Sequence, residues 1–157
     1  MPRLGVGRDG CRTPMQWSGE KYAGFSTAPP WLPVEPGYRG RNVASQNDVA
    51  TSVLALYRRL IALRHLHSAL RVGSYRPVIA AGELLLFVRE CESERLLVAL
   101  NLGHEPISVT FAGGHLQGHV LLSTFCDRHS EAASGCIDLR SDEGIIVKLA
   151  ASAALPG

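Results

Sequence analysis

The sequence predicts an α+β chain in which a long loop and one helix precede an all-β antiparallel sandwich. Three observations predict this fold class. The first 44 residues are dense in glycine and proline, residues 45–66 repeat apolar side chains at helical spacing, and after Gly73 the apolar period shortens to that of strands. Short strands that follow one another between turn residues are typical of an antiparallel sandwich.

The loop runs from Met1 to about Ala44. It also carries aromatic side chains, which a flexible linker lacks: Trp17, Tyr22, Phe25, Trp31 and Tyr38. Long ordered loops are more often functional than not. The stretch Arg8 to Trp17, RDGCRTPMQW, has neither the alternation of a strand nor the spacing of a helix, and is the most specific segment of the loop.

The helix is expected from about Ser45 to Leu66, with a broad apolar stripe. Ser45, followed by Asp48, resembles a capping box at its start. The basic side chains gather toward its C-terminal half, where they suit the helix dipole: Arg58, Arg59, Arg64 and His65. Because the stripe is broader than a lone surface helix needs, we expect the helix to bury against a sizeable partner.

Seven strands are expected after Gly73, separated by pieces such as Ala81-Gly82, Gly113-Gly114 and Ser134-Gly135. The charged turn ECESE makes the second and third of them a central hairpin. The expected ranges are 74–78, 84–90, 96–102, 107–111, 119–125, 137–139 and 144–149.

Composition excludes several classes of protein. With 16 basic and 14 acidic residues and no run of like charge, no nucleic-acid partner is expected. No apolar run approaches a membrane span, so no membrane partner is expected and a cytoplasmic location follows. The four cysteines and six histidines show no ligand spacing, so no metal and no cofactor are expected. The oligomeric state stays open.

Six ordered blocks carry a resemblance to a known family. The chain closely resembles the C-terminal part of α-glucosidases of glycoside hydrolase family 13, which include oligo-1,6-glucosidases and trehalose synthase relatives. The later FVRE and LLVALNLG are similar to the β-domain that closes those enzymes. The six blocks are RDGCRTPMQW, AGFS (23–26), PWLPV (30–34), NVASQ (42–46), YRRLIALR (57–64) and ALRVGSY (69–75).

The resemblance implies a domain organisation. Residues 1–72 would be the remnant of a (β/α)8 barrel, with the active-site loop after the eighth strand and the last barrel helix at about 48–66. Residues 73–157 would be the C-terminal β-sandwich domain. The sequence departs from the family near Asp142 to Gly144, where SDEGIIVKLA replaces the usual proline-aromatic entry into the final strand.

The resemblance also implies an activity, the retaining hydrolysis of terminal α-linked glucose in oligosaccharides. That mechanism needs a nucleophile and an acid, two carboxyl groups about 5 Å apart. In the family they lie upstream of the matching blocks, and Asp9 and Glu20 of this loop stand in neither motif. We therefore expect a fragment that is inactive alone and binds α-glucoside oligosaccharides only with the missing barrel. The alternatives are a trehalose synthase-type glucosyl transferase fragment and a non-catalytic, carbohydrate-associated β-sandwich module.

The expected site residues all lie in the RDGCRTPMQW loop. The resemblance makes Arg8 a substrate-binding residue, because a guanidinium suits both carboxylates and sugar hydroxyls. Asp9 and Arg12 are expected to pair and support the loop. Trp17 is expected to anchor it, in preference to stacking on a sugar ring. No residue of the chain is expected to be catalytic.

Overall fold

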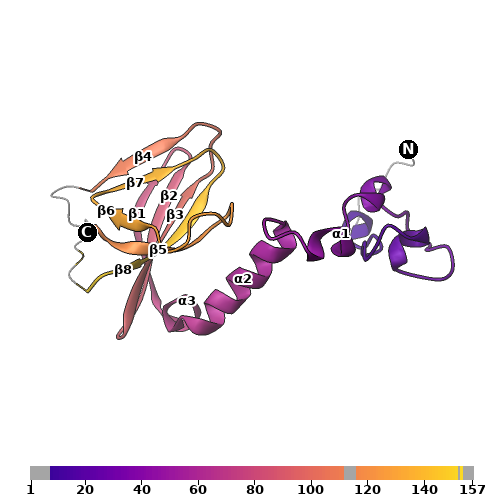
Figure 1. The fold of residues 1–157 in the computed structure, drawn as a ribbon, viewed down its shortest axis with the longest axis horizontal. Helices are drawn as coiled ribbons and strands as arrows, with labels where there is room; N and C mark the ends of the chain where they lie inside the picture. Colours follow the sequence, from indigo (N-terminus) through magenta and orange to yellow (C-terminus); the bar gives the residue numbers. More distant parts are fainter. Residues whose placement is uncertain (1–7, 112–115, 152, 154–157) are drawn as a thin grey trace. The chain divides into compact units, whose positions relative to one another are not determined.

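The computed structural model describes residues 8–111, 116–151 and 153. The chain divides into two compact units, Met1–Ala55 and Leu56–Gly157 (Figure 1). Unit 1 holds short helical turns, and unit 2 holds helix followed by strands. The predicted α+β class is confirmed, whereas the predicted domain boundary between residues 72 and 73 stays a prediction.

Unit 1 is built from short turns tied together by backbone hydrogen bonds. Its elements are η1 (Arg8–Cys11), η2 (Lys21–Gly24), η3 (Pro36–Arg39) and α1 (Val43–Asn47). The side chain of Asn42 makes buried polar contacts inside this unit. Asn42 is 4% exposed, and its Nδ2 donates to the Tyr38 carbonyl at 2.7 Å. The buried amide therefore joins η3 to the start of α1.

The predicted single helix over 45–66 is wrong, because the structure has two helices there: α1 (Val43–Asn47) and α2 (Val53–Leu66). The start of α1 also differs from the prediction. Asn42 is its N-cap and accepts from the Ser45 N–H at 2.8 Å, while Ser45 Oγ accepts from the Asn42 N–H at 3.2 Å. Ser45 is thus the third helical residue and completes a capping box that begins three residues earlier.

Short polar side chains account for the break between the two helices. Asp48 lies at the C-cap of α1 instead of inside a longer helix. Ser52 Oγ accepts from the Ala55 N–H at 3.1 Å and donates to the Gln46 carbonyl at 2.8 Å. These bonds offer the backbone an alternative to continuous helix, and they begin α2 as a separate element.

Unit 2 contains eight antiparallel strands in the order β1-β2-β3-β8-β5-β6-β7-β4. All seven predicted strands occur with small shifts of their ends. The added strand, β6, has three small residues and no alternation to predict it. The Gly113-Gly114 turn lies outside the described residues. The strands are β1 Ser74–Ala81, β2 Leu84–Cys91, β3 Glu94–Asn101, β4 Ile107–Thr110, β5 Gln117–Ser123, β6 Ala132–Ser134, β7 Cys136–Leu139 and β8 Gly144–Leu149.

The predicted central hairpin is confirmed. Cys91 of β2 pairs with Glu94 of β3, which leaves Glu92 and Ser93 as a two-residue turn. β8 then pairs with the other side of β3 and also with β5. β8, the last strand among the described residues, is therefore interior to the sheet.

One apolar core lies between the two halves of this sheet. Side chains of β2, β3, β5 and β8 meet those of β4 and β7 in a single cluster, as expected for a sheet folded over on itself. Each buried aliphatic side chain contributes about 1.5–3 kcal/mol. The largest buried members include Leu86, Leu97, Leu116, Leu139 and Ile145.

Helix α3 (Ser68–Val72) packs against β2 and β3. Glu94, which lies in β3, caps the N-terminus of α3, because its carboxylate accepts from the Ala69 N–H at 3.1 Å. The same carboxylate lies 2.6 Å from His67 Nδ1, and both side chains are nearly buried. Burial acts to raise the pKa of Glu94, but the hydrogen bonds from His67 and Ala69 outweigh it and lower the pKa. Glu94 therefore fixes α3 to the sandwich.

Replacing Glu94 should loosen this attachment. We expect Glu94→Gln to lower the free energy of unfolding at pH 7 by about 1.5–3 kcal/mol, because hydrogen bonds to a charged, nearly buried group are lost. Urea denaturation followed by circular dichroism measures the effect. Glu92→Gln, in the exposed β2–β3 turn, is the matched control. Equal stability of the two variants would contradict the capping role.

Candidate functional site

The predicted substrate-binding loop begins in η1. The backbone of Arg8 lies in this turn, whereas its side chain is outside the described part of the structure. A backbone hydrogen bond joins Arg12 N–H to the Asp9 carbonyl at 3.0 Å. Among the described ion pairs none joins the Asp9 carboxylate to the Arg12 guanidinium, whose residue is exposed. The loop turn is therefore held by main chain at this point.

Trp17 takes part in the loop through its backbone. Its N–H donates to the Ala23 carbonyl at 2.9 Å, and its carbonyl accepts from the Ala44 N–H at 2.9 Å. Its side chain is 51% exposed. The anchoring visible at this residue thus comes from main-chain bonds on both sides, and half of the indole faces solvent.

The Ala23 carbonyl is aimed by a left-handed turn. Three successive residues have positive φ: Tyr22 at 56°, Ala23 at 60° and Gly24 at 65°. Such a conformation costs free energy in residues other than glycine and is concentrated at functional positions. A Cβ at residue 24 would also lie 2.6 Å from Ser18 Oγ. The fully buried Ala23 methyl helps to hold this strained turn in place.

Two of the family-like blocks meet in unit 1. The Gln16 carbonyl accepts from the Val43 N–H at 2.9 Å, so RDGCRTPMQW and NVASQ are hydrogen-bonded to one another. A cavity here measures about 300 Å³, and its lining is Thr13, Pro14, Met15, Gln16, Arg41, Asn42, Val43 and Gln46.

The carboxylates of unit 1 do not form a pair suited to glycoside hydrolysis. Glu35 is in an ion pair with Arg41 at 3.1 Å, and both side chains are exposed. Glu20 is exposed and Asp9 is half-buried, in separate turns. The fourth carboxylate, Asp48, is exposed and accepts from Asn47 Nδ2 at 3.0 Å.

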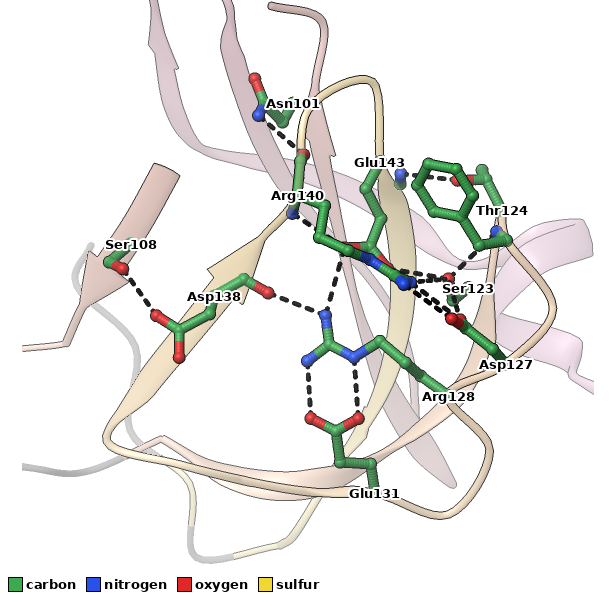
Figure 2. Close-up of polar contacts among 12 residues, drawn as sticks. Asn101, Ser108, Ser123, Thr124, Asp127, Arg128, Glu131, Asp138, Arg140 and Glu143 are labelled. Carbon is green, nitrogen blue, oxygen red and sulfur yellow. Dashed lines mark hydrogen bonds and ion pairs between the residues drawn. The ribbon is translucent and has the colours of Figure 1, made fainter. Parts of the chain in front are cut away.

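Unit 2 holds a second concentration of polar side chains around Glu143, which is 1% exposed (Figure 2). Its Oε1 accepts from Arg140 Nη2 at 2.7 Å and from Ser123 Oγ at 2.8 Å. Its Oε2 accepts from the Arg140 N–H at 2.9 Å and from Arg128 Nη1 at 3.3 Å. One carboxylate thus ties the end of β5, the loop after it and the end of β7 to the start of β8.

The two arginines extend this cluster outward. Arg140 forms a fork with Asp127, at 2.6 and 2.8 Å, and its guanidinium lies over the Phe125 ring at 4.4 Å. Figure 2 shows Arg128 bonded to Glu131 on one side and to the Asp138 carbonyl on the other. Planar forks of this kind give geometric specificity as well as energy.

The charges in the cluster shift each other's protonation. Burial acts to raise the pKa of Glu143, but hydrogen bonds from Arg140 and Ser123 and the charge of Arg128 lower it to about 2. Hydrogen bonds from Arg140 likewise lower the pKa of Asp127 to about 2. Both carboxylates are therefore ionised and fully engaged at neutral pH. The cluster is suited to holding loops together and leaves no acid or base free for proton transfer.

The sequence predicts the first of these two regions and not the second. The block pattern identified the RDGCRTPMQW loop, but nothing pointed to Glu143 as a buried hub. Its one signal was the departure from the family pattern at Asp142 to Gly144, where a carboxylate enters the final strand. In the described part of the chain, no group of three or more His, Cys, Asp or Glu side chains could hold a metal ion. Nor does that part contain a helix long and apolar enough to cross a membrane.

Comparison with known proteins shows that residues 2–73 are similar to a catalytic domain. Residues 2–73 match the family model described as "Alpha amylase, catalytic domain". An oligo-1,6-glucosidase of Heyndrickxia coagulans is 43% identical over 65% of this chain and 19% of its own length. A probable alpha-glucosidase of Rhizobium meliloti is 38% identical over 77% of this chain and 22% of its own length. The chain thus spans about a fifth of these relatives.

Solved structures extend the similarity to the strands. The trehalulose synthase MutB from Pseudomonas mesoacidophila MX-45 aligns with a TM-score of 0.83 and 33% identity, over 91% of this chain and 26% of its own. A MutB D200A mutant in complex with glucose aligns with a TM-score of 0.83 and 34% identity, with the same coverage. The similarity therefore includes both units of the chain.

Because of the Glu143 cluster, we expect the free energy of unfolding of unit 2 to depend on pH. Because the pKa of Glu143 is lower in the folded state than its ordinary value of 4.5, its contribution is complete above about pH 4.5 and is lost as the pH falls toward about 2. We expect Glu143→Gln to lower the free energy of unfolding at pH 7 by about 3 kcal/mol, since two arginines lose a buried partner.

Urea denaturation between pH 7 and pH 2 tests this expectation. The difference between the wild type and Glu143→Gln should shrink as the pH falls through the stated window. Glu92→Gln, which removes an exposed carboxylate in the β2–β3 turn, is the control and should follow the wild type at every pH. A difference that is constant with pH would show that the Glu143 charge does not stabilise the fold.

Proposed function

Because this chain belongs to the α-amylase family, glycoside hydrolase family 13, we propose that it forms part of an α-glucosidase. The whole enzyme hydrolyses terminal α-linked glucose from oligosaccharides. The observation that carries the proposal is the catalytic-domain match over residues 2–73, because that segment contains the RDGCRTPMQW loop. The names of the relatives, oligo-1,6-glucosidase and alpha-glucosidase, support the substrate class.

Within this proposal the loop supplies binding and the rest of the enzyme supplies the reacting groups. Arg8 binds sugar hydroxyls with its guanidinium fork, and Asp9, Arg12 and Trp17 support the loop that carries it. The nucleophile and the acid come from the portion of the relatives that this chain does not match. Consequently the chain alone does not hydrolyse α-glucosides, and it binds them only together with the rest of the enzyme.

A second candidate is sucrose isomerisation by glucosyl transfer. It is favoured by the solved structures that align with this chain, which are of a trehalulose synthase and include a complex with sucrose. Both candidates use the same retaining intermediate and differ in the acceptor that attacks it, water in one and a sugar hydroxyl in the other. A non-catalytic carbohydrate-binding module is the remaining alternative.

A chimera tests the proposal. The segment of the Heyndrickxia coagulans oligo-1,6-glucosidase that matches this chain is replaced by this chain, and release of p-nitrophenol from an α-glucoside is measured. We expect an active chimera in which Arg8→Ala lowers kcat/KM by at least about 100-fold, because charge-assisted bonds to the bound sugar are lost. Arg39→Ala, at an exposed position of the same unit, is the control and should keep the activity.

The outcomes separate the candidates. Products formed from sucrose distinguish hydrolysis, which releases glucose and fructose, from isomerisation, which yields a new disaccharide. A folded but inactive chimera would contradict both enzymatic proposals and favour the binding module. Release of p-nitrophenol by the isolated chain would contradict the assignment of the reacting carboxylates to the remainder of the enzyme.

A further inference from the structure

A cavity of about 350 Å³ lies at the end of the sandwich where β4 begins and β7 ends. It belongs to unit 2 and shares Arg128 and Arg140 with the Glu143 cluster. Small-molecule sites measure about 300–1,000 Å³, so this volume favours a small ligand. We call it the β4–β7 cavity, and its lining is Pro106, Ser108, Arg128, Glu131, Asp138, Leu139 and Arg140.

The charges around the β4–β7 cavity balance. Two guanidinium groups, of Arg128 and Arg140, line it together with two carboxylates, of Glu131 and Asp138. A hydrogen bond from Ser108 lowers the pKa of Asp138. A hydrogen bond from Arg128 likewise lowers the pKa of Glu131, so both carboxylates are ionised at neutral pH. An anion would meet like charge on the carboxylates, and a cation would meet it on the guanidinium groups. The lining therefore favours a neutral ligand.

Asp138 keeps one carboxylate oxygen open for a ligand. Ser108 Oγ donates to Asp138 Oδ1 at 2.6 Å, and the Cys136 thiol donates to the same oxygen at 3.5 Å. Figure 2 shows the second oxygen of Asp138 pointing away from Ser108. Asp138 is exposed, and a carboxylate has about four lone-pair sites. A hydroxyl group in the cavity can therefore donate to Asp138 Oδ2.

Glu131 offers a second acceptor in the same cavity. Arg128 Nε donates to its Oε2 at 2.8 Å, and Arg128 Nη2 donates to its Oε1 at 2.7 Å. Each oxygen has two lone pairs, so one on each is left after this fork. The Glu131 side chain is 47% exposed, which leaves these lone pairs within reach of a ligand. The cavity thus offers two separate carboxylate groups to hydroxyl donors.

These groups are fixed in place by the structure itself. Arg128, which orients Glu131, also donates to the Asp138 carbonyl at 2.7 Å and to the buried Glu143 carboxylate at 3.3 Å. Its side chain is only 17% exposed. Side chains held in this way lose little further freedom when a ligand binds. The polar groups of the cavity are therefore preorganised.

The class of ligand follows from these groups. Open carboxylate lone pairs require a neutral molecule with several hydroxyl donors. The exposed Pro106 ring adds an apolar contact beside them. A sugar ring combines both properties, because it carries hydroxyl groups at its edge and C–H groups on its faces. A divalent cation is disfavoured, since the guanidinium groups of Arg128 and Arg140 lie at the same cavity.

We propose that the β4–β7 cavity binds a free monosaccharide, whose ring hydroxyls donate to Asp138 Oδ2 and to the Glu131 carboxylate. The small volume favours a single sugar ring over a longer chain. This site uses residues of unit 2 alone and is distinct from the RDGCRTPMQW loop of unit 1. The choice of glucose as the probe rests on the proposed function, because an α-glucosidase releases glucose.

Titration of the full ¹⁵N-labelled chain with glucose, followed by nuclear magnetic resonance, tests the site. We expect saturable shifts of the Ser108, Glu131 and Asp138 amide signals, with a Kd on the order of 1–10 mM, because the site is small and open. Asp138→Ala should weaken binding by at least about tenfold, since a hydrogen bond to a charged acceptor is lost. Glu92→Ala, which removes an exposed carboxylate in the β2–β3 turn, is the matched control and should bind like the wild type.

A second variant covers the case in which Asp138→Ala does not fold. Glu131→Ala removes the other acceptor and should also weaken glucose binding by at least about tenfold. The absence of a saturable shift up to about 100 mM glucose would overturn the proposal. So would shifts that both variants leave unchanged, or tighter binding of inorganic phosphate or of lysine methyl ester, which would show that the cavity selects a charge.

These readouts keep the two proposals apart, because the titration does not depend on hydrolysis. An active chimera, built as in the preceding section, together with a chain that does not bind glucose would leave the proposed function standing and overturn the sugar site. Saturable binding at the β4–β7 cavity together with an inactive chimera would support the sugar site while contradicting the α-glucosidase assignment.

Discussion

The sandwich of unit 2 depends on one buried carboxylate. Glu143 stands at the entrance to β8, the strand that pairs with both β3 and β5, and it binds the side chains of Ser123, Arg128 and Arg140. These partners come from the ends of β5 and β7 and from the loop between β5 and β6. A charge removed from water is tolerated here because every oxygen of the carboxylate is satisfied. The loops at this end of the sheet are consequently specified by polar geometry, whereas the strands are specified by the apolar core.

This difference between polar loops and apolar strands explains which features could be predicted from the sequence. Apolar alternation is local, so the strands and the β2–β3 hairpin were predictable within a few residues. Side-chain bonds between distant residues have no local period. For that reason Glu143, the Glu94 cap on α3 and the Asn42 capping box were missed, and Ser45 was misplaced as an N-cap. The RDGCRTPMQW loop was identified by its residues, while the way it is held, through Ala23 and Ala44, required the structure.

The candidate site and the sandwich use different means of support. In unit 1 the loop is positioned by main-chain bonds, a strained left-handed turn and one buried amide, with few apolar residues beneath it. With so few buried apolar side chains, unit 1 requires these polar and main-chain bonds for its order. Unit 2 encloses a complete core and does not share this requirement.

The order of the strands also has a consequence for how the chain is made. β8 is the last strand in sequence yet sits in the middle of the sheet, where Leu96 of β3 pairs with Lys148. During synthesis the β1–β2–β3 meander emerges first, and the far edge of β3 keeps its unpaired backbone groups until β8 arrives. Pairing across so long a stretch of chain is slow compared with hairpin closure. The interval in which β3 waits for its neighbour is therefore the period when a nascent chain is most prone to pair with another copy.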